Sequence, residues 1–390
     1  MPIQKSATSK RRSRVGDLLA VLLLLAIVAG FGWLWWHQKH PAKSSKRRPV
    51  PVVQKVKKSP ANPPVVPSLV LVERKVEPFV ERTNPVPAVV SSNVPLPTPV
   101  VAAEFPRPAK NLLEAQIALA RRAISPGSID GAIGSQTRAA IAAFQHAQKL
   151  VQSRAPDTNT LSLLMLESPL LTDYTVTTND LARLQPLGKT WLAKSQQSAL
   201  EYETILELVA EKAHAHPALI QKINPAVDWA NVAAGTVLQI PDISYPEPDE
   251  KAARVIIHLS EKFLEAFGTE SNLLAHCPCS IAAKVEKRPV GELHVAVVAP
   301  NPNYTLDPAI FPESPEVQAI GHKLILQPGP NNPVGVAWIG LDKPGYGMHG
   351  TPSPEQIGRT ESHGCFRLAN WDAEYLVRLV WIGMPVEVVP

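Results

Sequence analysis

The segment Ser362-His363-Gly364-Cys365-Phe366-Arg367-Leu368 lies close to the C-terminus of the 390-residue chain, and His349-Gly350-Thr351 lies one loop upstream. The longer segment brings together an imidazole, a glycine, a thiol and a guanidinium, which are groups that nucleophilic catalysis uses. The chain has three cysteines, an odd number that excludes a complete disulfide framework. A lone cysteine is most often a small buried hydrophobe, but the neighbours of Cys365 favour a nucleophile.

An extended backbone here would put His363, Cys365 and Arg367 on one face, because side chains alternate along a strand. His363 would then be the base that forms the thiolate, and Arg367 would lower the pKa of the thiol or bind a substrate carboxylate. Gly364 would let the chain turn so that its own N–H and that of Cys365 point at an oxyanion. Ser362 would orient the imidazole. Taken singly, each residue also fits a structural role, and only the combination favours catalysis.

Residues 251–390 are rich in strand patterns that glycine and proline turns separate. One helix is predicted before the last strand, from Trp371 to Val380. The spacing favours a mainly β fold, either a β-sandwich or a partly closed barrel. The predicted strands are Arg254–Leu259, Phe263–Phe267, Leu293–Val298, Lys323–Leu326 and Val386–Val389.

This region resembles the catalytic domain of YkuD-type L,D-transpeptidases, which cross-link cell walls through a cysteine. The resemblance covers about 140 residues and rests on four motifs in family order. A departure is the Cys277-Pro278-Cys279 sequence, where family members more often carry an apolar residue in place of at least one cysteine. The four motifs are Arg288-Pro289-Val290-Gly291, His349-Gly350-Thr351, Ser362-His363-Gly364-Cys365 and Asn370-Trp371-Asp372.

The resemblance implies that Cys365 attacks the carbonyl of the third residue of a peptidoglycan stem peptide, releases a terminal D-alanine and forms a thioester. An amine of a neighbouring stem then resolves the thioester and links two third-position residues. His363 would serve as base and then as acid. His349 and Gly350 would shape the oxyanion and substrate site, together with Arg367. No metal or organic cofactor is required.

Cys277 and Cys279 lie two residues apart, so on a strand they face the same way, too far apart for an unstrained disulfide. A zinc site with His276 and Cys365 is conceivable, but its spacing is weak and it would consume the nucleophile. We expect one buried structural thiol and one thiol near the active cleft. Oxidation would then link Cys365 to one of them and switch the enzyme off.

The N-terminal third predicts a membrane anchor and a spacer. Residues 1–14 are basic and read as a cytoplasmic tail, and residues 15–36 are apolar over a length that crosses a bilayer as one helix. A cleaved signal peptide is the alternative, although no persuasive cleavage site follows the apolar run. Residues 37–108 are rich in proline and valine, which favours an extended linker, the alternative being a tail without function.

The net charge of +5 comes mainly from lysines and arginines between Lys5 and Lys58. No basic stripe interleaved with aromatic residues occurs in the rest of the sequence. We therefore interpret the positive charge as a determinant of membrane topology and expect no nucleic-acid partner.

Residues 109–168 resemble a small three-helix peptidoglycan-binding module. The resemblance rests on Asp130-Gly131, Gly134, Thr137 and the segment Ala140–Gln145. Ser135 is predicted to cap the second helix, and a further helix is predicted over Thr158–Leu166. A helical bundle that only spaces the domains is the alternative.

Residues 172–242 resemble a LysM cell-wall-binding module with an α+β fold. The order is a Tyr-x-Val strand at Tyr174, a helix from Tyr202 to His214, a second helix ending at Asn224-Pro225, and a strand at the end of the segment Gly235–Pro241. The stretch from Leu181 to Ala199 is longer than the usual module allows. A module that binds glycan and one that serves only for packing both remain open.

The sequence therefore predicts a multidomain, single-pass membrane protein whose catalytic domain lies on the extracytoplasmic side and acts on peptidoglycan stem peptides. The acyl acceptor is left open, because water or a protein amine would serve as well as a stem peptide. A non-catalytic wall tether is the alternative from a different class, although a tether has no need of a poised thiol.

Overall fold

The computed structural model describes residues 104–312, 314–359, 362 and 364–390, within one compact unit formed by Pro95–Pro390. The predicted tail (1–14), the predicted anchor (15–36) and nearly all of the predicted linker (37–108) lie outside the described residues. Within the described part of the chain, no helix is both long and apolar enough to span a bilayer. The membrane anchor therefore stays a prediction.

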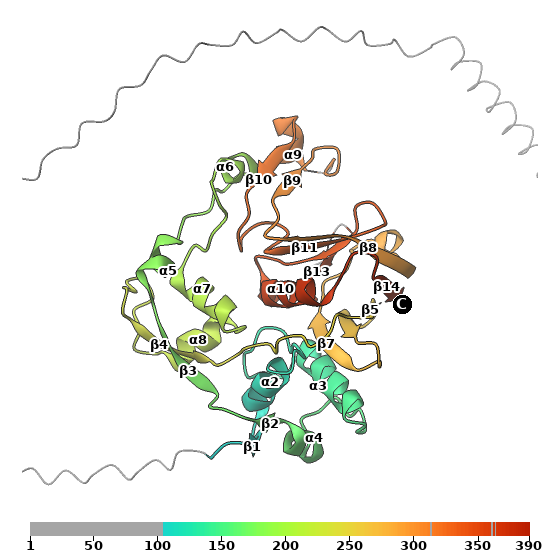
Figure 1. The fold of residues 1–390 in the computed structure, drawn as a ribbon. Coiled ribbons are helices and arrows are strands. Elements are labelled where there is room, and N and C mark those ends of the chain that lie inside the picture. Colours follow the sequence, from blue (N-terminus) through green and yellow to red (C-terminus); the bar gives the residue numbers. More distant parts are fainter. Residues whose placement is uncertain (1–103, 313, 360–361, 363) are drawn as a thin grey trace, which may run out of the picture. The chain divides into compact units, whose positions relative to one another are not determined.

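The first folded module is helical, as predicted. Its helices are α2 (Leu112–Ala120), α3 (Ser135–Ala147) and α4 (Thr158–Leu163), and its ends are joined by the short strands β1 (Arg107–Pro108) and β2 (Met165–Leu166), which pair antiparallel (Figure 1). The predicted cap at Ser135 is wrong by one residue. Gly134 holds the N-cap position without a side-chain hydrogen bond, and Ser135 is the first helical residue.

The middle module has the predicted order of strand, helix, helix and strand. Strands β3 (Leu171–Thr175) and β4 (Val237–Pro241) pair antiparallel, and α5 (Thr178–Ala182), α7 (Ile205–Lys212) and α8 (Pro217–Ile223) lie between them in the sequence. The long stretch between α5 and α7 contains a further short helix, α6 (Trp191–Ser195). The LysM identity of this module and its binding of glycan stay proposals.

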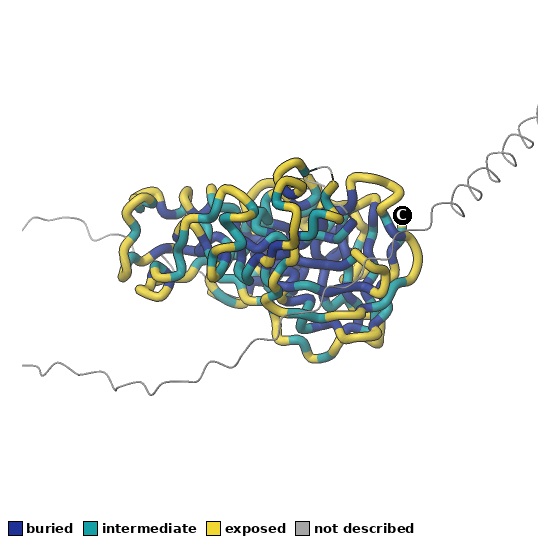
Figure 2. The backbone as a smooth tube through the Cα atoms, turned by 90° about the horizontal axis from the view of Figure 1, so that it is seen from above, coloured by how far each residue is buried: buried dark blue, intermediate teal, exposed yellow. Residues whose placement is uncertain are grey.

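The C-terminal domain is built on one mixed sheet of eight strands in the order β13-β12-β11-β8-β14-β5-β6-β7. Apolar side chains at alternate positions, such as Val255 and Ile257, are fully buried and form the core. Figure 2 draws the buried residues of the described chain in dark blue. The strands are β5 (Arg254–His258), β6 (Phe263–Phe267), β7 (Leu273–Pro278), β8 (Gly291–Pro300), β11 (Ala337–Leu341), β12 (Gly347–His349), β13 (Phe366–Arg367) and β14 (Pro385–Val389).

The two ends of this sheet meet. Ser280, just after β7, forms an antiparallel bridge with Arg367 of β13, and Ala282 forms a parallel bridge with Ser362. Two backbone hydrogen bonds of 2.9 and 3.0 Å join Ser280 and Arg367. The sheet is therefore curled toward closure, which agrees with the predicted partly closed barrel and not with a sandwich of two sheets.

Helix α10 (Asn370–Leu379) starts just after β13 and packs against β8, β11 and β12. Strands β9 (Tyr304–Leu306) and β10 (Leu324–Leu326) form a separate antiparallel pair, with α9 (Pro315–Ile320) between them in the sequence. Two short 3₁₀ helices, η1 (Val285–Lys287) and η2 (Pro354–Gln356), lie in loops. The predicted helix over Trp371–Val380 is confirmed to within one residue at each end.

The first turn of α10 joins all three folded parts of the chain. Ser125 of the helical module and Tyr245 of the segment after β4 both donate hydrogen bonds to the Asp372 carboxylate, at 3.0 and 2.7 Å. Asn370 donates to the carboxylate of Glu211 on α7 at 2.9 Å. The helix that follows the Cys365 segment is therefore fixed by side chains from both upstream modules.

Candidate active site

A cavity of about 900 Å³ lies beside the Cys365 segment. Ser362, Gly364, Cys365 and Arg367 all line it, as does His349 from the neighbouring strand. Five aromatic side chains contribute to its walls, and the described lining residues include no carboxylate. The five aromatic residues are Trp191, Tyr304, Phe311, Trp338 and Tyr346.

The parallel pairing of β12 and β13 brings the reactive side chains together. Met348 pairs with Phe366 and His349 with Arg367, and both Met348 and Phe366 are buried in the core, with 0% and 1% exposure. Since side chains alternate along a strand, His349 and Arg367 lie on the opposite face, toward the cavity. Cys365 is two residues before Arg367 and also lines the cavity.

The Cys365 thiol is partly buried and held by backbone groups. Its Sγ donates to the carbonyl oxygen of Gly345 at 3.5 Å. Burial raises the pKa of Cys365 to about 11, while the backbone amide of Gly347 and the Arg367 guanidinium act in the opposite direction. The resting thiol is therefore neutral at pH 7 and needs a base at the moment of attack.

His349 lines the same cavity and has the tautomer that such a base needs. Its Nδ1 lies 2.7 Å from the carbonyl oxygen of Gly350. Because a carbonyl only accepts, Nδ1 carries the hydrogen and Nε2 is left to accept a proton. Burial lowers the pKa of His349 to about 4, so the ring is neutral at pH 7. The ring of Trp338 stacks on it with centroids 5.6 Å apart.

His363, the predicted base, lies outside the described residues, and so does any contact it makes with Ser362. The described contacts of Ser362 shape the loop: its hydroxyl donates to the carbonyl oxygen of Cys365 at 2.5 Å and accepts from the N–H of Gly364 at 3.2 Å. The predicted use of the Gly364 N–H toward an oxyanion therefore competes with a hydrogen bond already present. Gly364 also has no left-handed φ, so its backbone does not require glycine.

Gly350, predicted to touch substrate, is buried and packs tightly against Asn370. A Cβ on Gly350 would lie 2.3 Å from Asn370 Oδ1, and one on Gly335 would lie 2.0 Å from the same atom. The structure therefore places Gly350 behind His349, where its carbonyl orients the imidazole.

Arg367 is partly buried beside Cys365, and burial lowers its pKa from an ordinary value of 12.5. Lys287 also lines the cavity, so the charged side chains among the described lining residues are cationic. The cavity thus favours a ligand that carries carboxylates.

For the other two cysteines, the prediction of a buried structural thiol is confirmed, and the prediction of a thiol near the active cleft is wrong. Cys277 and Cys279 are both buried in the core, with 1% and 0% exposure, and neither lines the cavity. Burial raises the pKa of Cys279 to about 12 and that of Cys277 well above its ordinary value. Across the described residues, no three His, Cys, Asp or Glu side chains cluster as metal ligands would.

The sequence pointed to Cys365 and Arg367 but not to His349 as a base, nor to Trp191, Lys287, Tyr304 or Phe311 as cavity residues. The sequence feature that could have indicated a catalytic role for His349 was its position in the predicted substrate loop His349-Gly350-Thr351. For the four lining residues there was no such signal, because they come from an upstream module and from elements of the catalytic domain that are distant from Cys365 in the sequence.

Comparison with known proteins assigns the C-terminal domain. Residues 252–388 match the YkuD family, described as "L,D-transpeptidase catalytic domain". The chain carries an L,D-transpeptidase catalytic domain. Residues 108–164 match a second family, described as "Putative peptidoglycan binding domain", which agrees with the predicted helical module.

Two relatives and one solved structure illustrate the similarity. "Putative L,D-transpeptidase YkuD" of Bacillus licheniformis is 27% identical over 188 residues, which are 48% of this chain and 94% of the relative. "Probable L,D-transpeptidase YbiS" of Escherichia coli K12 is 29% identical over 171 residues, 43% of this chain and 54% of the relative. L,D-transpeptidase 3 of Mycobacterium tuberculosis has a TM-score of 0.28 at 18% identity, covering 41% of this chain and 77% of that one.

Proposed function

We propose that this protein is a peptidoglycan L,D-transpeptidase that works through a thioester on Cys365. The observation that carries the proposal is the pairing of β12 with β13, which lines one cavity of an L,D-transpeptidase domain with both Cys365 and His349. A nucleophile and a base with a fixed tautomer are the parts that acyl transfer needs.

Acylation begins with the neutral thiol. Sγ of Cys365 attacks the carbonyl carbon of the third stem residue while its proton moves to Nε2 of His349. The N–H of Cys365 donates to the developing oxyanion. The carbon–nitrogen bond then breaks, and the leaving D-alanine amine takes the proton from His349. The product is a thioester between the stem peptide and Cys365.

Deacylation repeats these steps with an acceptor. An amine of a second stem attacks the thioester carbonyl and gives a proton to His349. The sulfur–carbon bond breaks, and the leaving sulfur regains the proton. Arg367 and the backbone amide of Gly347 favour negative charge on sulfur in both halves of the reaction.

This mechanism assigns the base to His349, whose geometry supports it. The role first predicted for His363 stays a prediction. Because both histidines are close to Cys365 in the sequence or in the sheet, separate substitutions are needed to divide the roles between them.

The decisive experiment is mass spectrometry of purified muropeptides incubated with the wild type and with Cys365→Ala. We expect the wild type to release D-alanine and join two third-position residues, and the variant to do neither. Stem peptides shortened without cross-links would identify water as the acceptor, and a stem joined to a protein amine would identify wall anchoring. Cross-linking by the variant would refute the proposal.

Delivery of this domain to the wall is part of the proposal. The helical module, the middle module and a membrane anchor at residues 15–36 would each hold the enzyme near peptidoglycan, and several weak attachments together raise its local concentration. An anchored protein keeps its full mass, so a mature form about 4 kDa smaller on a gel would contradict the anchor.

A further inference from the structure

The long stretch between α5 and α7 reaches the active-site cavity. Trp191, the first residue of α6, lines the cavity together with Cys365 and Arg367. Among the described lining residues, Trp191 alone comes from outside residues 251–390. The stretch is therefore part of the wall of the site, although it belongs to an upstream module.

Residues of the catalytic domain hold this stretch at two points. The backbone N–H of Trp191 donates to Glu316 Oε1 on α9 at 2.7 Å. Leu200 exchanges backbone hydrogen bonds with Pro328 and Asn331, each 2.9 Å long. A Cβ on Gly329 would lie 2.2 Å from the carbonyl oxygen of Leu200, so glycine is required for this close approach.

Apolar packing and internal hydrogen bonds add rigidity. Leu200 is fully buried in a cluster with Leu306 and Leu326, and the Trp191 ring packs against the same cluster. Within the stretch, the N–H of Gly188 donates to Gln197 Oε1 at 2.8 Å, and the Gln197 amide donates to the carbonyl oxygen of Pro186 at 3.0 Å. The indole is thus in place before a ligand arrives, which lowers the entropic cost of binding.

The surroundings of the indole indicate what it binds. Phe311 and Tyr304 contribute further aromatic surface, and Lys287 and Arg367 supply positive charge. Aromatic faces with nearby cations suit an aliphatic chain that carries carboxylates. We propose that Trp191 is a specificity-determining residue that packs against an aliphatic segment of the anionic donor stem peptide. This inference rests on the proposed function.

The test compares variants of the full-length protein on two probes. Trp191→Ala and Trp191→Phe are measured for release of D-alanine from a synthetic tetrapeptide stem, and for alkylation of Cys365 by iodoacetamide, followed by intact mass. Leu192→Ala is the matched control, because Leu192 is the next residue of α6, is 46% exposed and does not line the cavity. Iodoacetamide is too small to need the indole and reports only on the thiol.

We expect Trp191→Ala to raise the KM for the stem roughly ten-fold, the effect of losing one well-packed aromatic contact. The kcat and the alkylation rate should change less than about two-fold, because the reacting groups are untouched. Trp191→Phe should recover most of the KM, and Leu192→Ala should match the wild type.

Two results overturn the inference while the proposed function stands. One is a wild-type KM in Trp191→Ala, and the other is an equal loss in stem turnover and alkylation, which would make the role structural. A wild type that releases no D-alanine from the stem would refute the proposed function, and this inference with it.

Discussion

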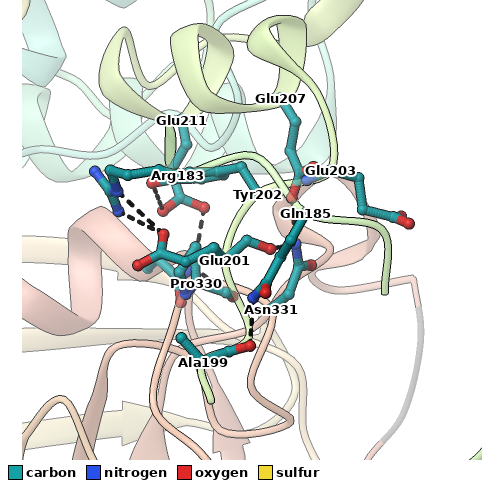
Figure 3. A network of polar contacts seen from close by, with 11 residues as sticks. Arg183, Gln185, Ala199, Glu201, Tyr202, Glu203, Glu207, Glu211, Pro330 and Asn331 are labelled. Atoms are coloured by element: carbon teal, nitrogen blue, oxygen red, sulfur yellow. Dashed lines mark hydrogen bonds and ion pairs between the residues drawn. The ribbon is translucent and has the colours of Figure 1, made fainter. Parts of the chain in front are cut away.

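The side-chain amide of Asn370 donates to the carboxylate of Glu211 at 2.9 Å, across the boundary between the catalytic domain and the middle module. Asn370 also donates to the carbonyl oxygen of Pro330 at 3.1 Å, and Tyr202 donates to the other oxygen of Glu211 at 2.9 Å. Figure 3 shows Glu211 and Tyr202 within a larger polar network that includes the Arg183–Glu201 ion pair. The active-site framework and the upstream module thus share buried polar contacts.

This network predicts a specific pH dependence of stability. Burial raises the pKa of Glu211 from an ordinary 4.5 to about 7, so the folded state binds this proton more tightly than the unfolded chain does. The resulting stabilisation is complete below pH 4.5 and is lost as the pH rises through 7. Glu211→Gln should remove this contribution, leaving a Tm that falls less than that of the wild type between pH 5 and pH 8.

The Tm of Glu211→Gln must be compared with the Tm of the wild type at each pH, because other buried groups titrate in both proteins. Burial lowers the pKa of His214 to about 3, so the contribution of His214 to stability has the opposite pH dependence. That contribution is lost as the pH falls. Glu270→Gln is the control, since Glu270 is exposed in the turn after β6 and is not among the charges that shift the pKa of Glu211. Parallel Tm profiles of Glu211→Gln and the wild type would contradict a titrating Glu211.

Gly350→Ala should impair catalysis without changing any reacting group. The new Cβ would lie 2.3 Å from Asn370 Oδ1, so the Gly350 carbonyl that orients His349 must move. Because displacements on the order of 1 Å at a reacting group cost about 100-fold in rate, we expect kcat to fall by 10-fold or more. The control is Gly134→Ala, where a Cβ meets nothing within 4 Å. Unchanged kcat in a folded Gly350→Ala variant would show that the carbonyl does not position the ring.

The two histidines make distinct predictions for the pH profile of activity. A base must be unprotonated to act, and burial holds the pKa of His349 at about 4. If His349 is the base, kcat/KM should stay high as the pH falls from 7 and decline only near pH 4. His349→Ala should lose on the order of 100- to 10,000-fold in kcat/KM. A larger loss in His363→Ala than in His349→Ala would return the role of base to His363.

Part of the fold and of the site was predictable from the sequence, and part was not. Strands such as β5 and β6, the longer helices and Cys365 follow from local patterns, because alternation and turn residues are properties of neighbouring positions. Strands β7, β11 and β12 were not predicted. His349 was not predicted as a base, because the parallel pairing of β12 with β13 brings it to the cavity of Cys365, and strand pairing is not a local property. Alternation along one strand could select only His363. Trp191 could not be predicted as a cavity residue for the same reason, since an upstream module brings it to the cavity.

Docking of the helical module can be tested at Ser125. Its hydroxyl donates to the buried carboxylate of Asp372, whose pKa burial raises to about 7. Ser125→Ala should lower the free energy of unfolding by about 1–3 kcal/mol, because it removes one of the two described donors to a buried carboxylate. Ser128→Ala is the matched control, since the buried Ser128 hydroxyl has no hydrogen-bond partner among the described residues. Urea denaturation at pH 8, where Asp372 is mostly ionised, measures the difference, and an equal effect of the two substitutions would mean that the Ser125–Asp372 hydrogen bond does not hold the module in place.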